Sequence, residues 1–173
     1  VGLIKGTLSK KIQLPRWGFK RAKNIAYRHN LAEDFLCNTL GIPWFEVHKH
    51  AHQLEHAMTP LVVRKLAEFL GKPEFCPHGT PMPGQSLPEN SFTLDQAQAG
   101  SSIEVAMIGE DLEDSVELMR VLQNQQMMPG HKHTILERSE VMQSITLDNG
   151  KGPSVLPMHV AQKIIVIPSP ALV

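Results

Sequence analysis

Four histidines and one glutamate stand within nine consecutive residues near the middle of the chain, His48-Lys49-His50-Ala51-His52-Gln53-Leu54-Glu55-His56. Successive residues of a helix turn by about 100°, which places four of these side chains in one sector about 100° wide: His48, His52, Glu55 and His56. Imidazole and carboxylate groups in this arrangement are suitable ligands for a divalent first-row metal. The alternative is a solvated helix face that happens to be rich in histidine.

An apolar stripe lies beside these polar side chains on the same helical wheel, and it indicates an amphipathic helix that faces a core. It consists of Val47, Ala51, Leu54 and Met58. His50 points away from both sectors, so we expect it to be solvated.

A second pair of possible ligands, His29 and Glu33, is spaced one helical turn apart in a segment upstream. Ile25, Ala32 and Leu36 give that segment helical apolar spacing, and His29 falls on its apolar side. A single histidine there is usually a hydrogen-bonded core residue. The glutamate one turn on and the histidine-rich helix downstream favour a metal site instead.

Composition and charge limit the class of protein. With 173 residues, 42% of them apolar, the chain is long enough for one large or two small domains. No apolar run approaches 18 residues and no signal-peptide pattern is present, so we expect a soluble cytoplasmic protein. Cys37 and Cys76 are too few for a disulfide framework and are expected to be reduced, with Cys37 as a small buried apolar residue.

Positive charge is concentrated at the amino end. Residues 1–28 hold eight Lys or Arg, whereas all 17 acidic residues lie beyond them. This asymmetry favours contact with phosphates, most simply those of nucleic acid, although an ordinary solvated terminus would have the same composition. The chain begins with Val1 rather than Met, which suggests a fragment.

The pattern along the chain predicts helices first and strands later. Residues 2–14 suggest two short strands, and Pro15 precedes helices expected over 16–40, 43–58 and 60–71. Proline and glycine rule out regular structure over 72–90. Strands are then expected over 102–108, 133–137, 141–147 and 163–167, with one helix over 111–126. These elements predict an α+β protein that ends in a small barrel.

Three motifs resemble those of the diphtheria-toxin-repressor or iron-dependent-repressor family of metal-activated transcriptional regulators. Arg28-His29-Asn30-Leu31-Ala32-Glu33 matches its R-H-x-L-x-E helix, and the stretch from Val47-His48 to Leu54-Glu55-His56 matches its V-H-x5-L-E-H helix. Cys76-Pro77-His78-Gly79-Thr80-Pro81-Met82-Pro83-Gly84 is close to its C-P-H-G-x-P-I-P-G loop. The carboxyl-terminal part, with Met127-Met128-Pro129-Gly130 after its helix, resembles the family's SH3-like domain of the ferrous-transport-accessory (FeoA) type.

The resemblance implies a division into four parts. Residues 1–15 would be the remnant wing of a winged helix-turn-helix domain, and 16–84 an all-helical metal-binding and dimerisation domain. Residues 85–91 would be a linker, and 92–173 the SH3-like β-barrel. The recognition helix of the family would lie before Val1, so that the wing lysines Lys5, Lys10 and Lys11 would be the DNA-contacting residues that remain.

The resemblance also implies two metal positions. His29, Glu33 and His48 match the ancillary site, to which the SH3-like domain would add Asp114 and Glu117; alternatively, these two acids simply favour a helix amino terminus. His52, Glu55 and His56 match the primary, regulatory site. Iron-type relatives have Cys and manganese-type relatives an acid where His52 stands, so His52 itself does not indicate the metal. The resemblance implies Fe²⁺ or Mn²⁺, and a set of nitrogen and oxygen ligands is also compatible with Co²⁺, Ni²⁺ or Zn²⁺ as substitutes.

The implied function is a metal-dependent repressor of metal-uptake genes that binds operator DNA as a homodimer. This part of it alone would bind DNA weakly or not at all. The apolar residues available for dimerisation, or for the core of the helical domain, are Phe35, Leu36, Leu61, Val62, Leu66, Phe69 and Leu70.

Two other classes of protein compete with this interpretation. A metalloenzyme is disfavoured because neither the Glu-x-x-His repeats of di-iron bundles nor a His-Glu-x-x-His motif is present. The other is a metal-buffering or ferrous-transport accessory protein without DNA binding.

Overall fold

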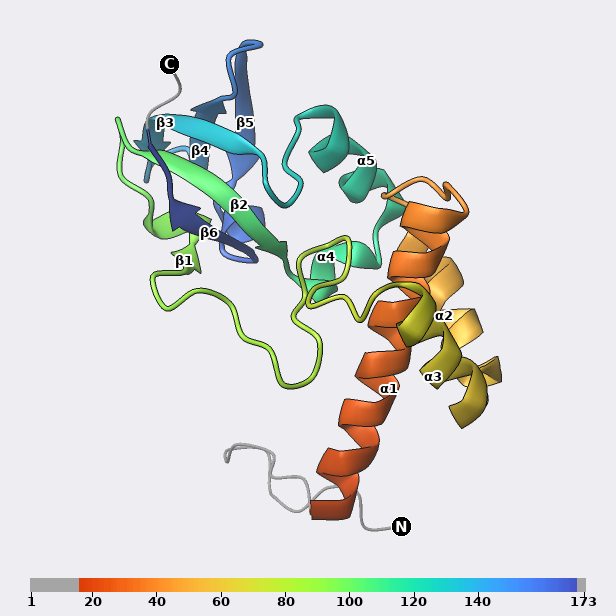
Figure 1. Cartoon of the computed structure of the whole chain (residues 1–173). Helices are drawn as coiled ribbons and strands as arrows, with labels where there is room; N and C mark the ends of the chain where they lie inside the picture. Colours follow the sequence, from red (N-terminus) through yellow and green to blue (C-terminus); the bar gives the residue numbers. More distant parts are fainter. Residues whose placement is uncertain (1–15, 171–173) are drawn as a thin grey trace.

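The computed structural model describes residues 16–170, and the side chains from 21 onward (Figure 1). A helical part is followed by a curved sheet, which confirms the predicted α+β class with a small SH3-like barrel after the helices. The wing hairpin predicted over residues 2–14, with Lys5, Lys10 and Lys11, lies outside the described residues.

Three helices form the first part: α1 (Arg16–Asp34), α2 (Val47–Ala57) and α3 (Pro60–Phe69). A π-helical turn, η1 (Phe35–Thr39), extends α1, so the helix predicted over 16–40 is not one regular α-helix. The Thr59 hydroxyl accepts a hydrogen bond from the Val62 amide, and Pro60 occupies the first turn of α3. The buried apolar residues between these helices are Leu31, Ala32, Leu36, Val47, Ala51, Met58, Val63, Ala67 and Met82.

The second part is an antiparallel sheet in the order β1-β6-β2-β3-β4-β5. Its strands are β1 (Phe92–Thr93), β2 (Ser102–Ile108), β3 (Lys132–Ser139), β4 (Ser144–Asp148), β5 (Pro153–Pro157) and β6 (Ile164–Pro168). The short helices are η2 (Leu94–Gln96), α4 (Glu110–Glu113), α5 (Val116–Asn124) and α6 (Met158–Ala161). One apolar core, which includes Leu122, Ile135 and Ile164, fills the concave side.

The single helix predicted over 111–126 is wrong. The helix is interrupted after Glu113, and Ser115 starts α5 by accepting a hydrogen bond from the Leu118 amide. The edge strands β1 and β5 were not predicted. β1 has only two residues, and β5 begins and ends with proline, which is tolerated mainly at sheet edges.

The helical part is joined to the barrel by an aromatic contact. Trp44, which precedes α2, packs into the barrel core, and its indole N–H donates to the Pro77 carbonyl at 2.9 Å. The Arg120 guanidinium of α5 lies 4.5 Å from the ring centre of Phe45. Both contacts bury or cover apolar surface across the junction and so fix the two parts relative to each other.

A tight backbone approach reinforces this junction. The Ile108 amide of β2 donates to the carbonyl of His78 at 2.9 Å, beyond a register shift between Val105 and Met107. The adjacent Gly79 has φ +88°, and a Cβ on it would lie 2.0 Å from the Ala106 carbonyl oxygen. Only glycine therefore fits between the loop and the strand.

Replacing Gly79 with alanine should destabilise the fold by about 2–5 kcal/mol, since backbone strain and a collision with a strand add together. Gly71→Ala is the matched control: Gly71 has a similar φ of +73°, but an added Cβ meets nothing within 4 Å. It should cost only about 1 kcal/mol. Urea unfolding followed by circular dichroism measures both, and equal losses would contradict the close approach.

Candidate metal centre

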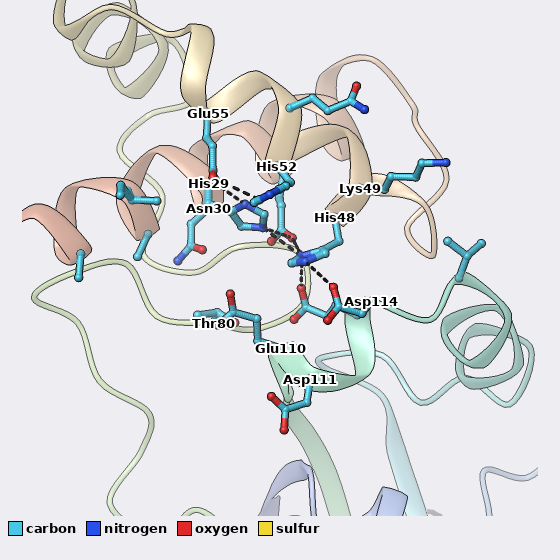
Figure 2. Close-up of a pocket in the computed structure, with 17 residues that line it drawn as sticks. His29, Asn30, His48, Lys49, His52, Glu55, Thr80, Glu110, Asp111 and Asp114 are labelled. Carbon is cyan, nitrogen blue, oxygen red and sulfur yellow. Dashed lines mark hydrogen bonds and ion pairs between the residues drawn. The ribbon is translucent and has the colours of Figure 1, made fainter. Parts of the chain in front are cut away.

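Helices α1 and α2 bring three of the predicted ligands together (Figure 2). His29 and Glu33 lie one turn apart on α1, and His29 Nε2 is 3.0 Å from Glu33 Oε1. His48, in the first turn of α2, places Nδ1 3.0 Å from His29 Nε2 and 3.1 Å from Glu33 Oε1. The helical spacing noted in the sequence therefore produces one compact group of nitrogen and oxygen atoms.

Glu113 of the barrel completes this group. Strand β2 leads through Gly109 directly into α4, whose last residue, Glu113, points its carboxylate at α2, with Oε2 2.9 Å from His48 Nδ1. A Cβ on Gly109 would lie 2.6 Å from the Lys163 carbonyl, so glycine is needed for this sharp exit from the sheet. We call His29, Glu33, His48 and Glu113 the inner cluster; their ligand atoms all lie within 4.8 Å of one another.

His78 and Cys76 lie behind the inner cluster. The fully buried His78 ring places Nδ1 3.2 Å from Glu33 Oε1 and 3.1 Å from Glu113 Oε2, while its Nε2 donates to the Trp44 carbonyl at 3.0 Å. Cys76, His78 and Glu33 form a second group of possible ligand atoms. Burial raises the pKa of the Cys76 thiol to about 11, so this thiol is protonated at neutral pH in the metal-free protein.

The buried carboxylates dominate the electrostatics of the centre. Burial alone would raise the pKa of Glu33, but hydrogen bonds from three imidazoles outweigh it and hold that pKa well below its usual value. Hydrogen bonds to Glu113 and Glu33 raise the pKa of His48 to about 10 against the opposing effect of burial. Protons on imidazole thus balance the carboxylate charge in the metal-free protein.

The inner cluster has the composition of a divalent-cation site. Two carboxylates and two imidazoles form a donor set suited to divalent first-row metals. Glu113 Oε1 is buried and has no hydrogen-bond partner among the described residues. A bound ion would compensate both carboxylates and use this uncompensated oxygen.

Two further histidines of α2 and the glutamate between them form what we call the outer cluster: His52, Glu55 and His56. The buried Glu55 carboxylate lies beneath two exposed rings, with Oε1 3.3 Å from both His52 Nδ1 and His56 Nε2. These histidine side chains are 68% and 67% exposed. His50 is exposed as predicted.

The two predicted barrel ligands, Asp114 and Glu117, lie outside the inner cluster. Asp114 is 86% exposed, with Oδ1 3.7 Å from His48 Nε2. Glu117 is exposed on α5 and does not line the cavity at the centre. Their neighbour Glu113 was missed because the predicted continuous helix hid the break after it. His78 and Cys76 were also missed, although the Cys-Pro-His-Gly motif contains two residues of ligand type.

A cavity of about 840 Å³ leads from the surface to both clusters. Its walls come from α1, α2 and α4, and it reaches His29, Glu33 and Glu113 at its base. Exposed acids, Glu110, Asp111 and Asp114, line it on the barrel side (Figure 2). Their negative charge favours the approach of cations.

Comparison with known proteins assigns the helical part of the chain. The sequence model described as "Iron dependent repressor, metal binding and dimerisation domain" matches residues 16–84. The iron-dependent repressor IdeR of Mycobacterium leprae is 28% identical over 175 residues, which cover 94% of this chain and 76% of that protein. Residues 16–84 are thus assigned to the metal-binding and dimerisation domain of iron-dependent repressors, and most of the chain is similar to such a repressor.

Another repressor and a solved structure agree with this assignment. The iron-dependent repressor IdeR of Mycobacterium tuberculosis is 30% identical over 146 residues, 78% of this chain and 64% of that repressor, slightly less than two thirds of its length. A solved structure named "Manganese-dependent transcriptional repressor complex with manganese" is 27% identical, with a TM-score of 0.84, and the match covers 97% of this chain and 78% of that one.

These named relatives are repressors rather than enzymes. In the part of the chain that the structure describes, no helix is both long and apolar enough for a membrane span.

Cation binding at the inner cluster should release protons. His48 has a pKa of about 10 without a cation, so near pH 7 it is protonated and its proton competes with the metal. The apparent affinity should rise with pH, up to about tenfold per unit for each proton released, and level off near pH 10. Calorimetric titration with Mn²⁺ in two buffers of different ionisation enthalpy measures the release. Binding without proton release would contradict it.

Proposed function

We propose that this chain is the metal-sensing and dimerising part of a repressor that a divalent cation, Fe²⁺ or Mn²⁺, activates to bind operator DNA at metal-uptake genes. The names of its relatives support this: iron-dependent repressors among proteins of similar sequence and manganese-dependent repressors among proteins of similar structure. Co²⁺, Ni²⁺ and Zn²⁺ are expected to substitute, since affinity order alone does not select among such metals.

The observation that carries the proposal is the convergence of His29, Glu33, His48 and Glu113. Their ligand atoms come from two helices and the barrel, yet lie within 4.8 Å of one another. A cation held there would bind to three elements at once and favour the arrangement that brings them together. The ion would do no chemistry; its role would be to shift a conformational equilibrium.

The outer cluster is the proposed regulatory site. His52, Glu55 and His56 offer three protein ligands on an open surface, and further ligands would come from the amino-terminal residues that the resemblance implies. Occupancy of this site would then fix the position of a DNA-binding head relative to the helices. Sequence recognition would belong to that head, so the part described here would bind DNA weakly or not at all.

Helix α3 provides the proposed dimer surface. Among the predicted dimer residues, Leu36 is buried in the domain's own core, whereas Leu61, Val62 and Phe69 are exposed on α3. Phe69 packs edge-on against Phe35, with ring centres 6.5 Å apart, which extends the apolar face toward α1. A second copy of this chain would cover these side chains.

The metal centre is tested by His48→Ala. Calorimetric titration with Mn²⁺ or Co²⁺ should show more than about a 100-fold loss of affinity, because removal of a ligand costs more than removal of an outer hydrogen-bond partner. His50→Ala, on the exposed side of the same helix, is the control and should bind like the unaltered chain. Equal affinities of the two variants would refute the centre.

The dimer is tested by Phe69→Glu, which places a charge in the proposed interface. Sedimentation should give twice the 19.3 kDa chain mass for the unaltered protein and a single chain for the variant. Val141→Glu is the control, since Val141 is 93% exposed on the barrel, away from α3. Monomeric unaltered protein at tens of micromolar would contradict the proposal.

A further inference from the structure

The imidazole of His29 links the two clusters. Its Nε2 faces Glu33 and His48 of the inner cluster at 3.0 Å each, and its Nδ1 lies 2.8 Å from Glu55 Oε2. His29 and Glu55 are both buried, so this contact at the base of the cavity is largely removed from bulk water. Figure 2 shows the ring of His29 between Glu55 and His48.

The two nitrogens of one imidazole are chemically coupled. A cation bound through the Nε2 lone pair leaves the ring proton on Nδ1, where it can be donated to the Glu55 carboxylate. The bond from N–H to a carboxylate is charge-assisted and favours a basic, correctly oriented ring. The geometry of the structure already matches this arrangement, since Glu55 Oε2 is at hydrogen-bond distance from His29 Nδ1.

Glu55 divides its two oxygens between the clusters. Oε2 accepts from His29, whereas Oε1 lies 3.3 Å from each of the exposed histidines, His52 and His56. Any change that reorients the His29 ring therefore moves the carboxylate that the outer cluster needs. In the same way, a change in the charge of Glu55 reaches the inner cluster through the ring.

We propose that Glu55, besides its place in the outer cluster, is a positioning residue for a cation in the inner cluster, acting through His29 and coupling the two clusters. This inference rests on the metal centre described under the proposed function. A cation in the inner cluster fixes the His29 ring, which anchors Oε2 and presents Oε1 to the outer cluster. Coupling of binding free energies is reciprocal, so each cation strengthens the binding of the other.

Glu55→Gln tests the coupling because it removes the charge and keeps a hydrogen-bond acceptor of the same length. Titration with Co²⁺ should show an inner-cluster affinity about 10-fold to 100-fold weaker, the range for loss of an outer partner of a metal-bound histidine. His50→Ala is the matched control, because His50 is exposed on the same helix and belongs to neither cluster. Its inner-cluster affinity should stay within about threefold.

Glu33→Gln separates failure of this inference from failure of the metal centre. If Glu33→Gln removes Co²⁺ binding while Glu55→Gln and His50→Ala bind alike, the coupling is refuted and the centre stands. If Glu33→Gln binds Co²⁺ normally, the centre itself is refuted. Loss in Glu33→Gln and weakening in Glu55→Gln alone support both.

A spectroscopic measurement on the unaltered chain covers the case in which Glu55→Gln fails to fold. With Zn²⁺ bound, ¹⁵N spectra of histidine-labelled protein should show His29 with its proton on Nδ1. The assignment comes from the signal lost in His29→Gln. A His29 proton on Nε2, with Nδ1 on the metal, would overturn the proposal, whereas a ring with only a packing role need not select either nitrogen.

Discussion

Burial of the Glu33 carboxylate is the constraint on which the rest of the structure depends. Its side chain is only 1% exposed, and a carboxylate without compensation is costly at such a depth. Compensation comes from imidazoles on three separate segments: His29 on α1, His48 on α2 and His78 in the loop before the barrel. These segments therefore meet at one buried charge, and a bound cation would compensate that charge in place of the imidazole protons.

The same charge connects the helical part to the barrel. His78 contacts Glu113 as well as Glu33, and its backbone carbonyl accepts from β2, so the loop and α4 approach the centre together. Trp44 fills the barrel core from the helical side and donates to Pro77 in that loop. Apolar burial holds the junction, and the polar atoms within it select one arrangement, because a small displacement would leave buried carboxylates without partners.

The site residues that could be predicted from the sequence are those that lie on helices with regular apolar spacing. His29, Glu33 and His48 lie on helices with clear apolar stripes, so their faces could be derived. Glu113 was not found in this way, because five acids stand from Glu110 to Glu117 and the predicted continuous helix hid the break between Glu113 and the Ser115 cap of α5. His78 and Cys76 lie in a proline-rich loop without a period, and the two-residue strand β1 is too short to leave a pattern.

The contrast between the two clusters follows from their depth. The inner cluster is enclosed by α1, α2 and α4, and its histidine side chains are 11% and 13% exposed, so its ligands are fixed by the fold itself. The outer cluster has one buried carboxylate beneath two exposed rings, so a cation bound there could take further ligands from another segment. A site that is completed by ligands from another segment is suited to regulation, because its occupancy changes the arrangement of the chain. A preformed site mainly adds stability to an arrangement that already exists. His29 belongs to the preformed site and contacts the Glu55 carboxylate of the open one. In the proposed coupling, the free energy of cation binding at the inner cluster would therefore favour cation binding at the outer cluster through this one imidazole.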